Sequence, residues 1–169
     1  MRLLGGIGAI AIVVAVAAVI FFFGGFYNVA ATQEDPGIIK WVLVKVREAS
    51  INRHAGVTPA VNLADPAVIK EGAQAFATRG CVNCHGAPGE TWQKFSEAMR
   101  PDPPDLADVI KELEPGQLFW VIKHGINMTG MPGFALIGAE DKEIWSIVAF
   151  VKKLPEVSEA DYKAWTTPK

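Results

Sequence analysis

The chain has 169 residues, half of them hydrophobic, and a formal net charge of −2 at pH 7. This length is enough for one domain with its own core. Residues 57–169 carry eleven basic and fifteen acidic side chains, a net −4, whereas residues 1–56 carry +2. The acidic balance of the larger part argues against nucleic acid as a partner and against a docking face built from a ring of lysines.

The chain begins with an uncharged apolar stretch of 25 residues, Leu3 to Tyr27. As a helix it would be about 37 Å long, enough to cross a hydrocarbon core of about 30 Å. The alternative is a cleaved signal peptide, because Val29-Ala30-Ala31 suits the small-residue rule for cleavage. Signal peptides usually have apolar cores of only about 7–15 residues. We therefore expect residues 1–31 to be an uncleaved signal-anchor.

A short break leads into a second predicted helix, over residues 36–53, with Asp35 as its cap and Pro36 at its first position. The helix is too apolar to stand alone in water. Three placements stay open: on the bilayer surface with Trp41 at headgroup level, against a partner subunit, or over the rest of the chain. Together with a linker at residues 54–64, it makes residues 32–64 a juxtamembrane amphipathic helix and linker.

Residues 65–155 are predicted to be helical, with loops between the helices and no alternating strand pattern. Asp65-Pro66 opens a helix that continues to about Arg79, with Gly80 just past its end. A shorter helix is expected over 117–123, and a last one from about 140 to Leu154. Residues 156–169 are expected to be a loosely held C-terminal tail.

The run Cys81-Val82-Asn83-Cys84-His85 directly follows the first of these helices. The spacing C-x-x-C-H is typical of covalent haem attachment, with two thiols for the vinyl groups and a histidine beneath the iron. A zinc site and a redox dithiol are the alternatives. The chain has only two further histidines, His54 and His124, which form no paired cluster, and no βαβ pattern surrounds the motif.

A second axial ligand is expected from the glycine-rich loop at residues 125–134. Met131 is the preferred candidate, because Pro132 stiffens its approach and neighbouring glycines let the backbone pass close to the porphyrin. Met128 and His124 remain as alternatives. His54 is expected to be a solvated loop residue. Ligation by His85 and Met131 would give a higher reduction potential than two histidines.

The order of helix, C-x-x-C-H, proline-rich loop, short helix, Gly-Met-Pro loop and final helix resembles a class I monohaem cytochrome c over residues 65–155. Gly72 and Phe76 match the position where that family packs its first helix against its last, and Trp145 and Phe150 match the aromatic counterparts. The resemblance implies that the Pro104 carbonyl, in the loop 101–106, accepts the Nδ1 proton of His85 and orients its ring.

The expected fold is therefore all-α: a class I cytochrome c domain around one covalently attached haem c, preceded by a transmembrane and a juxtamembrane helix. The expected haem-binding residues are Cys81, Cys84, His85, Met131 and Pro104, with His85 and Met131 as the ligands of the iron. The expected function is single-electron transfer and not catalysis. The expected partners are a donor dehydrogenase or quinol-oxidising complex and a higher-potential acceptor, an oxidase or cytochrome.

Arg2 precedes the apolar stretch, which favours an N-terminus inside the cell. The expected location is the bacterial inner membrane, crossed once, with the haem domain in the periplasm. Two other functions stay open. One is a haem-based sensor or peroxidase-like enzyme, which needs an open distal position. The other is a structural haem subunit of a larger complex.

Overall fold

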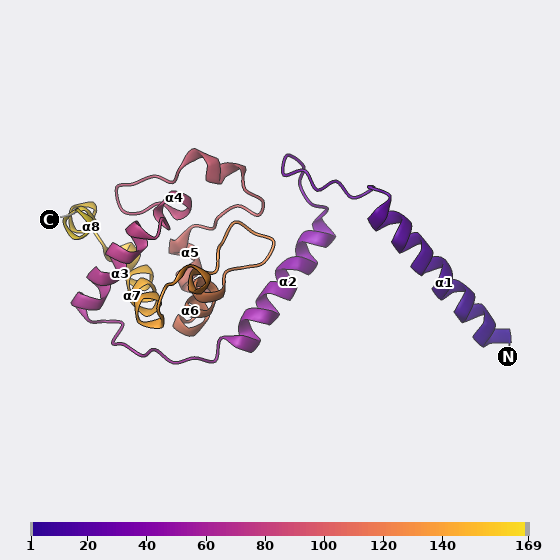
Figure 1. Cartoon of the computed structure of the whole chain (residues 1–169), viewed down its shortest axis with the longest axis horizontal. Helices are drawn as coiled ribbons and strands as arrows, with labels where there is room; N and C mark the ends of the chain where they lie inside the picture. The colour runs from indigo at the N-terminus through magenta and orange to yellow at the C-terminus, as the bar shows by residue number, and fades with distance from the viewer. Residues whose placement is uncertain (1, 168–169) are drawn as a thin grey trace. The chain divides into compact units, whose positions relative to one another are not determined.

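The structure is a computed structural model that describes residues 2–167. Within this range it is all-α, with eight α-helices and three short 3-10 helices, and it has no strand beyond an isolated bridge between Ala87 and Glu90. The chain forms two compact units, Met1–Asp35 and Pro36–Lys169. Figure 1 shows the helices of each unit along the chain.

The first unit contains α1 (Arg2–Phe23) and the loop that follows it. The window Gly6–Phe23 has a mean hydropathy of 2.9, and none of it is buried. By length and composition this helix can cross a membrane, although a signal sequence meets the same description. The helix ends where Gly24 donates its N–H to the Ile20 carbonyl and Gly25 adopts a positive φ of 73°.

The second unit holds all the other elements. In chain order they are α2 (Gly37–His54), α3 (Pro66–Thr78), α4 (Val82–His85), η1 (Lys94–Ala98), α5 (Leu106–Glu112), α6 (Pro115–His124), η2 (Phe134–Ile137), α7 (Asp141–Lys153), η3 (Leu154–Glu156) and α8 (Glu159–Thr166). The predicted helices over 36–53, 65–79, 117–123 and 140–154 are confirmed to within a few residues. Helices α4, α5 and α8 and the 3-10 segments were not predicted.

The core is centred on the crossing of α3 and α7, the pair of helices in closest contact. A Cβ built at Gly72 would lie 1.9 Å from the backbone oxygen of Ser146, so only glycine allows the two helices to come this close. Beside it, the rings of Phe76 and Phe150 pack edge to face with centroids 5.2 Å apart. Trp145 faces α6 instead, where it stacks on Phe119 at 4.3 Å. The packing predicted for Gly72, Phe76 and Phe150 is therefore confirmed.

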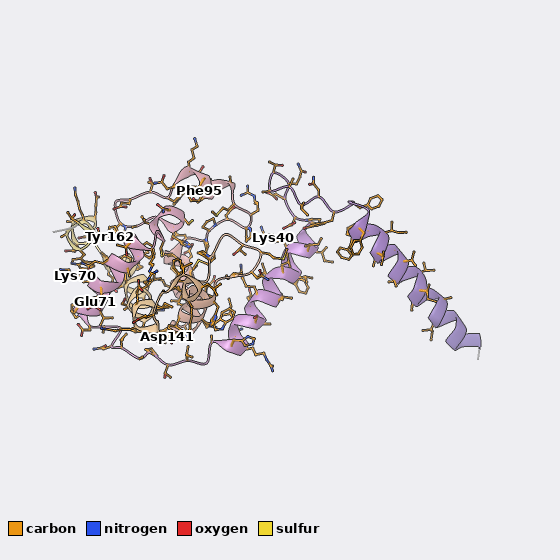
Figure 2. All side chains as sticks on the ribbon, viewed as in Figure 1. Lys40, Lys70, Glu71, Phe95, Asp141 and Tyr162 are labelled. Carbon is orange, nitrogen blue, oxygen red and sulfur yellow. The ribbon has the colours of Figure 1, made fainter. Side chains whose placement is uncertain are left out.

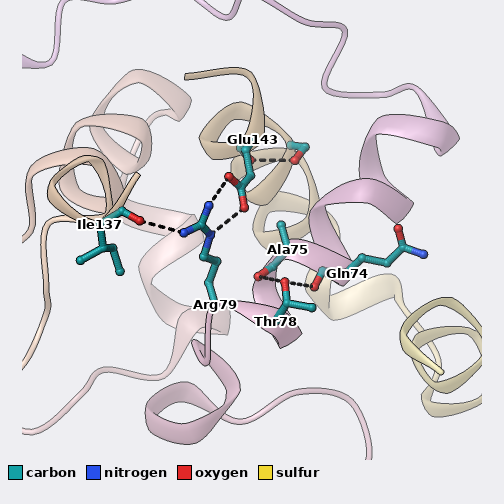
Figure 3. A network of polar contacts seen from close by, with 7 residues as sticks. Gln74, Ala75, Thr78, Arg79, Ile137 and Glu143 are labelled. Atoms are coloured by element: carbon teal, nitrogen blue, oxygen red, sulfur yellow. Dashed lines mark hydrogen bonds and ion pairs between the residues drawn. The ribbon is translucent and has the colours of Figure 1, made fainter. Parts of the chain in front are cut away.

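An ion pair at the edge of this crossing joins the same two helices. The Arg79 guanidinium donates from Nε and Nη2 to the two carboxylate oxygens of Glu143, each at 2.7 Å, and from Nη1 to the Ile137 carbonyl at 3.1 Å (Figure 3). This fork-to-fork geometry is the strong form of a carboxylate–guanidinium pair. It fixes the last turn of α3, directly before the cysteine motif.

Two predictions, one before α2 and one at the C-terminal end of the chain, were wrong. Asp35 does not cap α2, because the N-cap is Pro36 and the Asp35 carboxylate accepts the Tyr27 hydroxyl proton instead. The predicted loose tail is a helix, α8, capped by Ser158. Tyr162 of α8 is 1 % exposed and stacks against Phe150, and the Gln74 side chain of α3 donates to the Trp165 carbonyl. The tail is thus part of the folded unit.

Candidate functional site

The C-x-x-C-H segment is placed by the way α3 ends. Gly80 has a positive φ of 79°, its N–H binds the Ala77 carbonyl, and the Cys81 N–H binds the Phe76 carbonyl. This is the Schellman pattern, with glycine at C′ and Cys81 as the next residue. The first cysteine is therefore held directly against the end of a helix whose other side forms the core.

One turn of helix, α4, then brings the second cysteine and the histidine round to the same region. The N–H groups of Cys84 and His85 both bind the Cys81 carbonyl, at 3.2 and 3.0 Å. Both cysteines are free thiols and partly buried. Burial, with a smaller contribution from the nearby Cys84, raises the pKa of the Cys81 thiol to about 12, so this sulfur is protonated at neutral pH.

His85 has one fixed ring nitrogen and one that remains available. Its Nδ1 lies 3.0 Å from the Pro104 carbonyl oxygen, which can only accept, so Nδ1 carries the proton. Burial lowers the pKa of His85, and the hydrogen bond to Pro104 opposes this only in part. The ring is thus neutral with an unprotonated Nε2, the form in which histidine binds a metal.

The methionine loop between α6 and η2 is closed at its base by close backbone contact. A Cβ at Gly125 would lie 2.5 Å from the Gly133 nitrogen, and Gly125 has a φ of 68°. Inside the loop, the Ile126 N–H binds the Met131 carbonyl at 3.2 Å. Met131 is partly buried and packs against the core, whereas Met128 is 91 % exposed with a positive φ of 60°.

Two residues of this region that the sequence analysis did not identify support the loop. The Thr129 hydroxyl donates to the Ile126 carbonyl at 2.7 Å and accepts the Met131 N–H at 3.1 Å. Met99 lies so close to Gly130 that a Cβ there would come within 2.6 Å of its sulfur. The hydroxyl of Thr129, two residues before Met131, could have indicated a hydrogen bond within the loop. Met99 is distant from the loop in the sequence, so no local pattern indicated its contact.

The two remaining histidines lie together at a different place. The His54 ring at the end of α2 stacks on Trp120 of α6 at 5.8 Å, and the His124 ring lies 5.2 Å from the same indole. Both histidines are exposed. Within the described residues, no group of three or more His, Cys, Asp or Glu side chains is arranged to hold a metal ion. The zinc alternative therefore lacks its ligands in residues 2–167.

These residues fit a covalently attached haem. Two thiols one turn apart suit the two vinyl groups, and a neutral histidine follows them with its Nε2 available. The thioether of Met131, in a separate and internally hydrogen-bonded loop, is a candidate second donor of the type found in electron-carrying cytochromes. The structure brings Cys81, Cys84, His85 and Pro104 into one cluster and holds Met131 in a loop against the same core.

An all-helical domain with this motif directly after α3, and with α3 and α7 crossing at a glycine, defines a class I cytochrome c. Residues 67–151, half of the chain, match the sequence model of a protein family described as cytochrome c oxidase, cbb3-type, subunit III. The chain belongs to this family, which implies a covalently bound haem c and an electron-transfer role. No curated protein and no solved structure gave a significant match.

Proposed function

We propose that this protein is a membrane-anchored carrier of single electrons, with one haem attached through Cys81 and Cys84 and its iron held by His85 and Met131. The observation that carries the proposal is the Pro104–His85 hydrogen bond, 3.0 Å long, directly after the two thiols. It leaves a neutral imidazole whose only free nitrogen is the metal-binding one. Such an outer-shell partner is a regular feature of histidines that bind metals.

As the second iron ligand, Met131 is favoured over Met128 and His124 because its side chain is partly buried and its backbone is held by hydrogen bonds. Its side chain packs against the core and its backbone is hydrogen-bonded on both sides, to Thr129 and Ile126. Met128 is almost fully exposed, and His124 lies beside an indole at the C-terminal end of α6. A weak sulfur–iron bond needs a ligand held in place beforehand, which describes Met131.

When bound, the haem would supply the redox chemistry, a reversible one-electron change. The chain's own residues hold it and set its environment. Pro104 keeps His85 in one tautomer, the sulfur of Met131 would favour the reduced state, and the apolar core against which Met131 packs would limit the access of water. No side chain is assigned a proton-transfer role.

The proposed location is a bacterial inner membrane, crossed once by α1, with the second unit in the periplasm. Arg2 before the apolar helix and the site of haem attachment support this orientation. The proposed partners are a donor dehydrogenase or quinol-oxidising complex and a higher-potential acceptor. The name of the family, a subunit of an oxidase, is in keeping with an acceptor of this type.

Replacing the three candidate ligands one at a time tests the ligand and the function together. We expect Met131→Ala to remove the sulfur-to-iron charge-transfer band of the oxidised protein, and to let carbon monoxide bind rapidly to the reduced protein. Met128→Ala and His124→Ala should leave the band in place. Potentiometry should show a lower reduction potential in Met131→Ala alone, because a thioether ligand stabilises the ferrous state.

Two results would contradict the proposal. If the unaltered protein, once reduced, bound carbon monoxide rapidly and fully, its distal position would be open and a sensor or enzyme would be favoured. If Met131→Ala changed the spectrum but left electron flow through the native membrane unchanged, the haem would be a structural element and not a carrier.

A further inference from the structure

The outward side of α2 is apolar although it faces away from the body of the second unit. Ile38, Val42 and Val46 follow one another at every fourth position, so they form one line along the helix, with Leu43 beside it. They are 74, 44, 61 and 56 % exposed. We call these four residues the outer face of α2. A row of exposed aliphatic side chains on one face marks a contact surface.

The C-terminal end of the same helix is fixed to α6. Ile51 is 5 % exposed, the Asn52 side chain accepts a hydrogen bond from Gln117 at 2.6 Å, and His54 stacks on Trp120. Val42 and Ile51 are nine residues apart, which is about two and a half turns, so they lie on opposite sides of the helix. The body of the unit therefore covers one side of α2 near its end and leaves the outer face uncovered.

Positive charge is concentrated on this helix. Helix α2 has four basic side chains and one acidic side chain, Glu48, so its net charge is +3, whereas residues 55–169 have a net charge of −4. The basic residues are Lys40, Lys45, Arg47 and Arg53. On the helical wheel, Lys45 and Arg47 lie to either side of the outer face. The Lys45 ammonium is paired with Glu48 of the same helix at 2.7 Å, whereas the long stem of Arg47 lets its charged end reach past the outer face. Figure 2 shows Lys40 on the N-terminal half of α2. Among the parts of the second unit, α2 is the one whose charge suits an anionic surface.

The place of α2 in the chain indicates what that surface is. Only the 13 residues from Gly24 to Pro36 separate it from α1, the helix long enough to span a membrane. Fully extended, such a segment reaches about 45 Å at most. The apolar line flanked by basic residues, with Trp41 beside it at 61 % exposure, has the composition of helices that lie in the headgroup region of a bilayer.

We propose that the outer face of α2 lies in the headgroup region of an anionic lipid bilayer. Because Asn52 and His54 join α2 to α6, this contact holds the second unit in one orientation relative to the membrane plane. The site of electron entry and exit then faces membrane-bound partners in a defined way. This role goes beyond electron carriage and does not depend on which residues bind the iron.

Photo-crosslinking tests the contact directly. A diazirine amino acid is placed at position 42 or, as the matched control, at position 57; the native valines there are 44 and 43 % exposed. The full-length haem-loaded protein is reconstituted in phosphatidylcholine vesicles with and without phosphatidylglycerol. We expect lipid adducts at position 42 to exceed those at 57 by about tenfold, and to increase when the anionic lipid is present.

Equal and low lipid labelling at the two positions would show that α2 stays in water and would overturn the proposal. Irradiating the same diazirine at position 42 in native membranes distinguishes a lipid contact from a protein contact. Adducts to a polypeptide in place of lipid would assign the outer face to a protein partner and would overturn the proposal. Unchanged haem content and absorption spectrum of each labelled protein would confirm that it is folded.

The orientation is tested by polarised absorption of the haem in oriented bilayers. We expect a clear dichroism for the unaltered protein and at least about a twofold loss in Val42→Glu/Val46→Glu, which cannot bury its outer face. Val57→Glu should keep the dichroism. A double variant as strongly oriented as the unaltered protein would show that α1 alone sets the orientation and would overturn this part of the proposal.

Discussion

At the scale of single residues, the methionine loop depends on Thr129. Its hydroxyl is both a donor, to the Ile126 carbonyl, and an acceptor, from the Met131 N–H. The two hydrogen bonds link Ile126, two residues after the end of α6, to the proposed iron ligand and leave the loop few other conformations. Thr129 thereby positions the side chain that we propose as the iron ligand.

We predict that Thr129→Val weakens the sulfur–iron bond by about 1 kcal/mol, because the shape is kept while two hydrogen bonds are lost. The guanidinium concentration at which the sulfur-to-iron band disappears should fall relative to the concentration at which the helices melt. Thr129→Ser retains the hydroxyl and should behave like the unaltered protein. An equal fall in both transitions would mean that Thr129 supports the whole fold and not the loop.

At the scale of elements, the crossing of α3 and α7 is the contact on which the position of the haem motif depends. We predict that Gly72→Ala lowers the free energy of unfolding by about 3 kcal/mol, because its Cβ would overlap the Ser146 backbone, which cannot move aside like a side chain. Gly56→Ala is the control, since nothing lies within 4 Å of a Cβ there. Denaturant titration compares them; similar losses would contradict the packing argument.

The ion pair between α3 and α7 makes stability depend on acidity. Arg79 lowers the pKa of Glu143 below its ordinary value of 4.5, mainly through the hydrogen bonds to the carboxylate. In the unfolded chain this carboxylate protonates near 4.5, while in the folded chain it stays charged to lower pH. Its stabilising effect is therefore complete above that value and is lost as the pH falls through the lowered pKa.

We predict that Glu143→Gln costs about 1 kcal/mol at neutral pH and flattens the acid limb of the stability curve. Glu48→Gln is the control, because its partner Lys45 is on the same exposed helix and the two side chains are 46 and 57 % exposed. Urea unfolding at a series of pH values gives both quantities. Parallel acid limbs for Glu143→Gln and the unaltered protein would contradict a lowered pKa.

Helix ends that are set by a capping or terminating residue next to the helix were predictable from the sequence. Contacts between residues that are distant in the sequence were not. Asp65 predicts the start of a helix, and Gly80 and Gly125 predict helix ends. The structure has α3 beginning after Asp65 and α3 and α6 ending just before these two glycines. Asp35 was misread because the same residue type also accepts side-chain donors, here Tyr27. Arg79 and Glu143 are 64 positions apart, so no local pattern could pair them.

At the scale of the whole molecule, the last helix shows why the tail was misjudged. Residues 156–169 are mostly polar, and Pro155 is an ordinary helix terminator, so the local sequence favours a free end. Tyr162 packs against Phe150 of α7, and Gln74 of α3 donates a hydrogen bond to Trp165, so both contacts depend on residues far from the tail in the sequence. The stability of α8 thus comes from tertiary contact and not from its own propensity.

The organisation of the chain leads to a prediction about the mature protein. Eighteen consecutive exposed apolar residues in α1, a basic and apolar α2 and a single C-x-x-C-H motif favour a retained anchor and one haem. We predict that peptide mapping of the protein extracted from membranes recovers the Leu3–Tyr27 stretch, and that the ratio of haem to polypeptide is one. Washing with alkaline carbonate should leave the protein in the membrane.

If the mature chain instead began at about residue 32, α1 would be a signal peptide and α2 would have to hold the protein to the membrane alone. The carbonate wash would then release it, because an interfacial helix binds reversibly whereas a spanning helix does not. Release by carbonate together with lipid adducts at position 42 would identify a peripheral cytochrome; retention with the same adducts would identify an anchored one that is also oriented by α2. The two measurements together therefore assign separate roles to the two N-terminal helices.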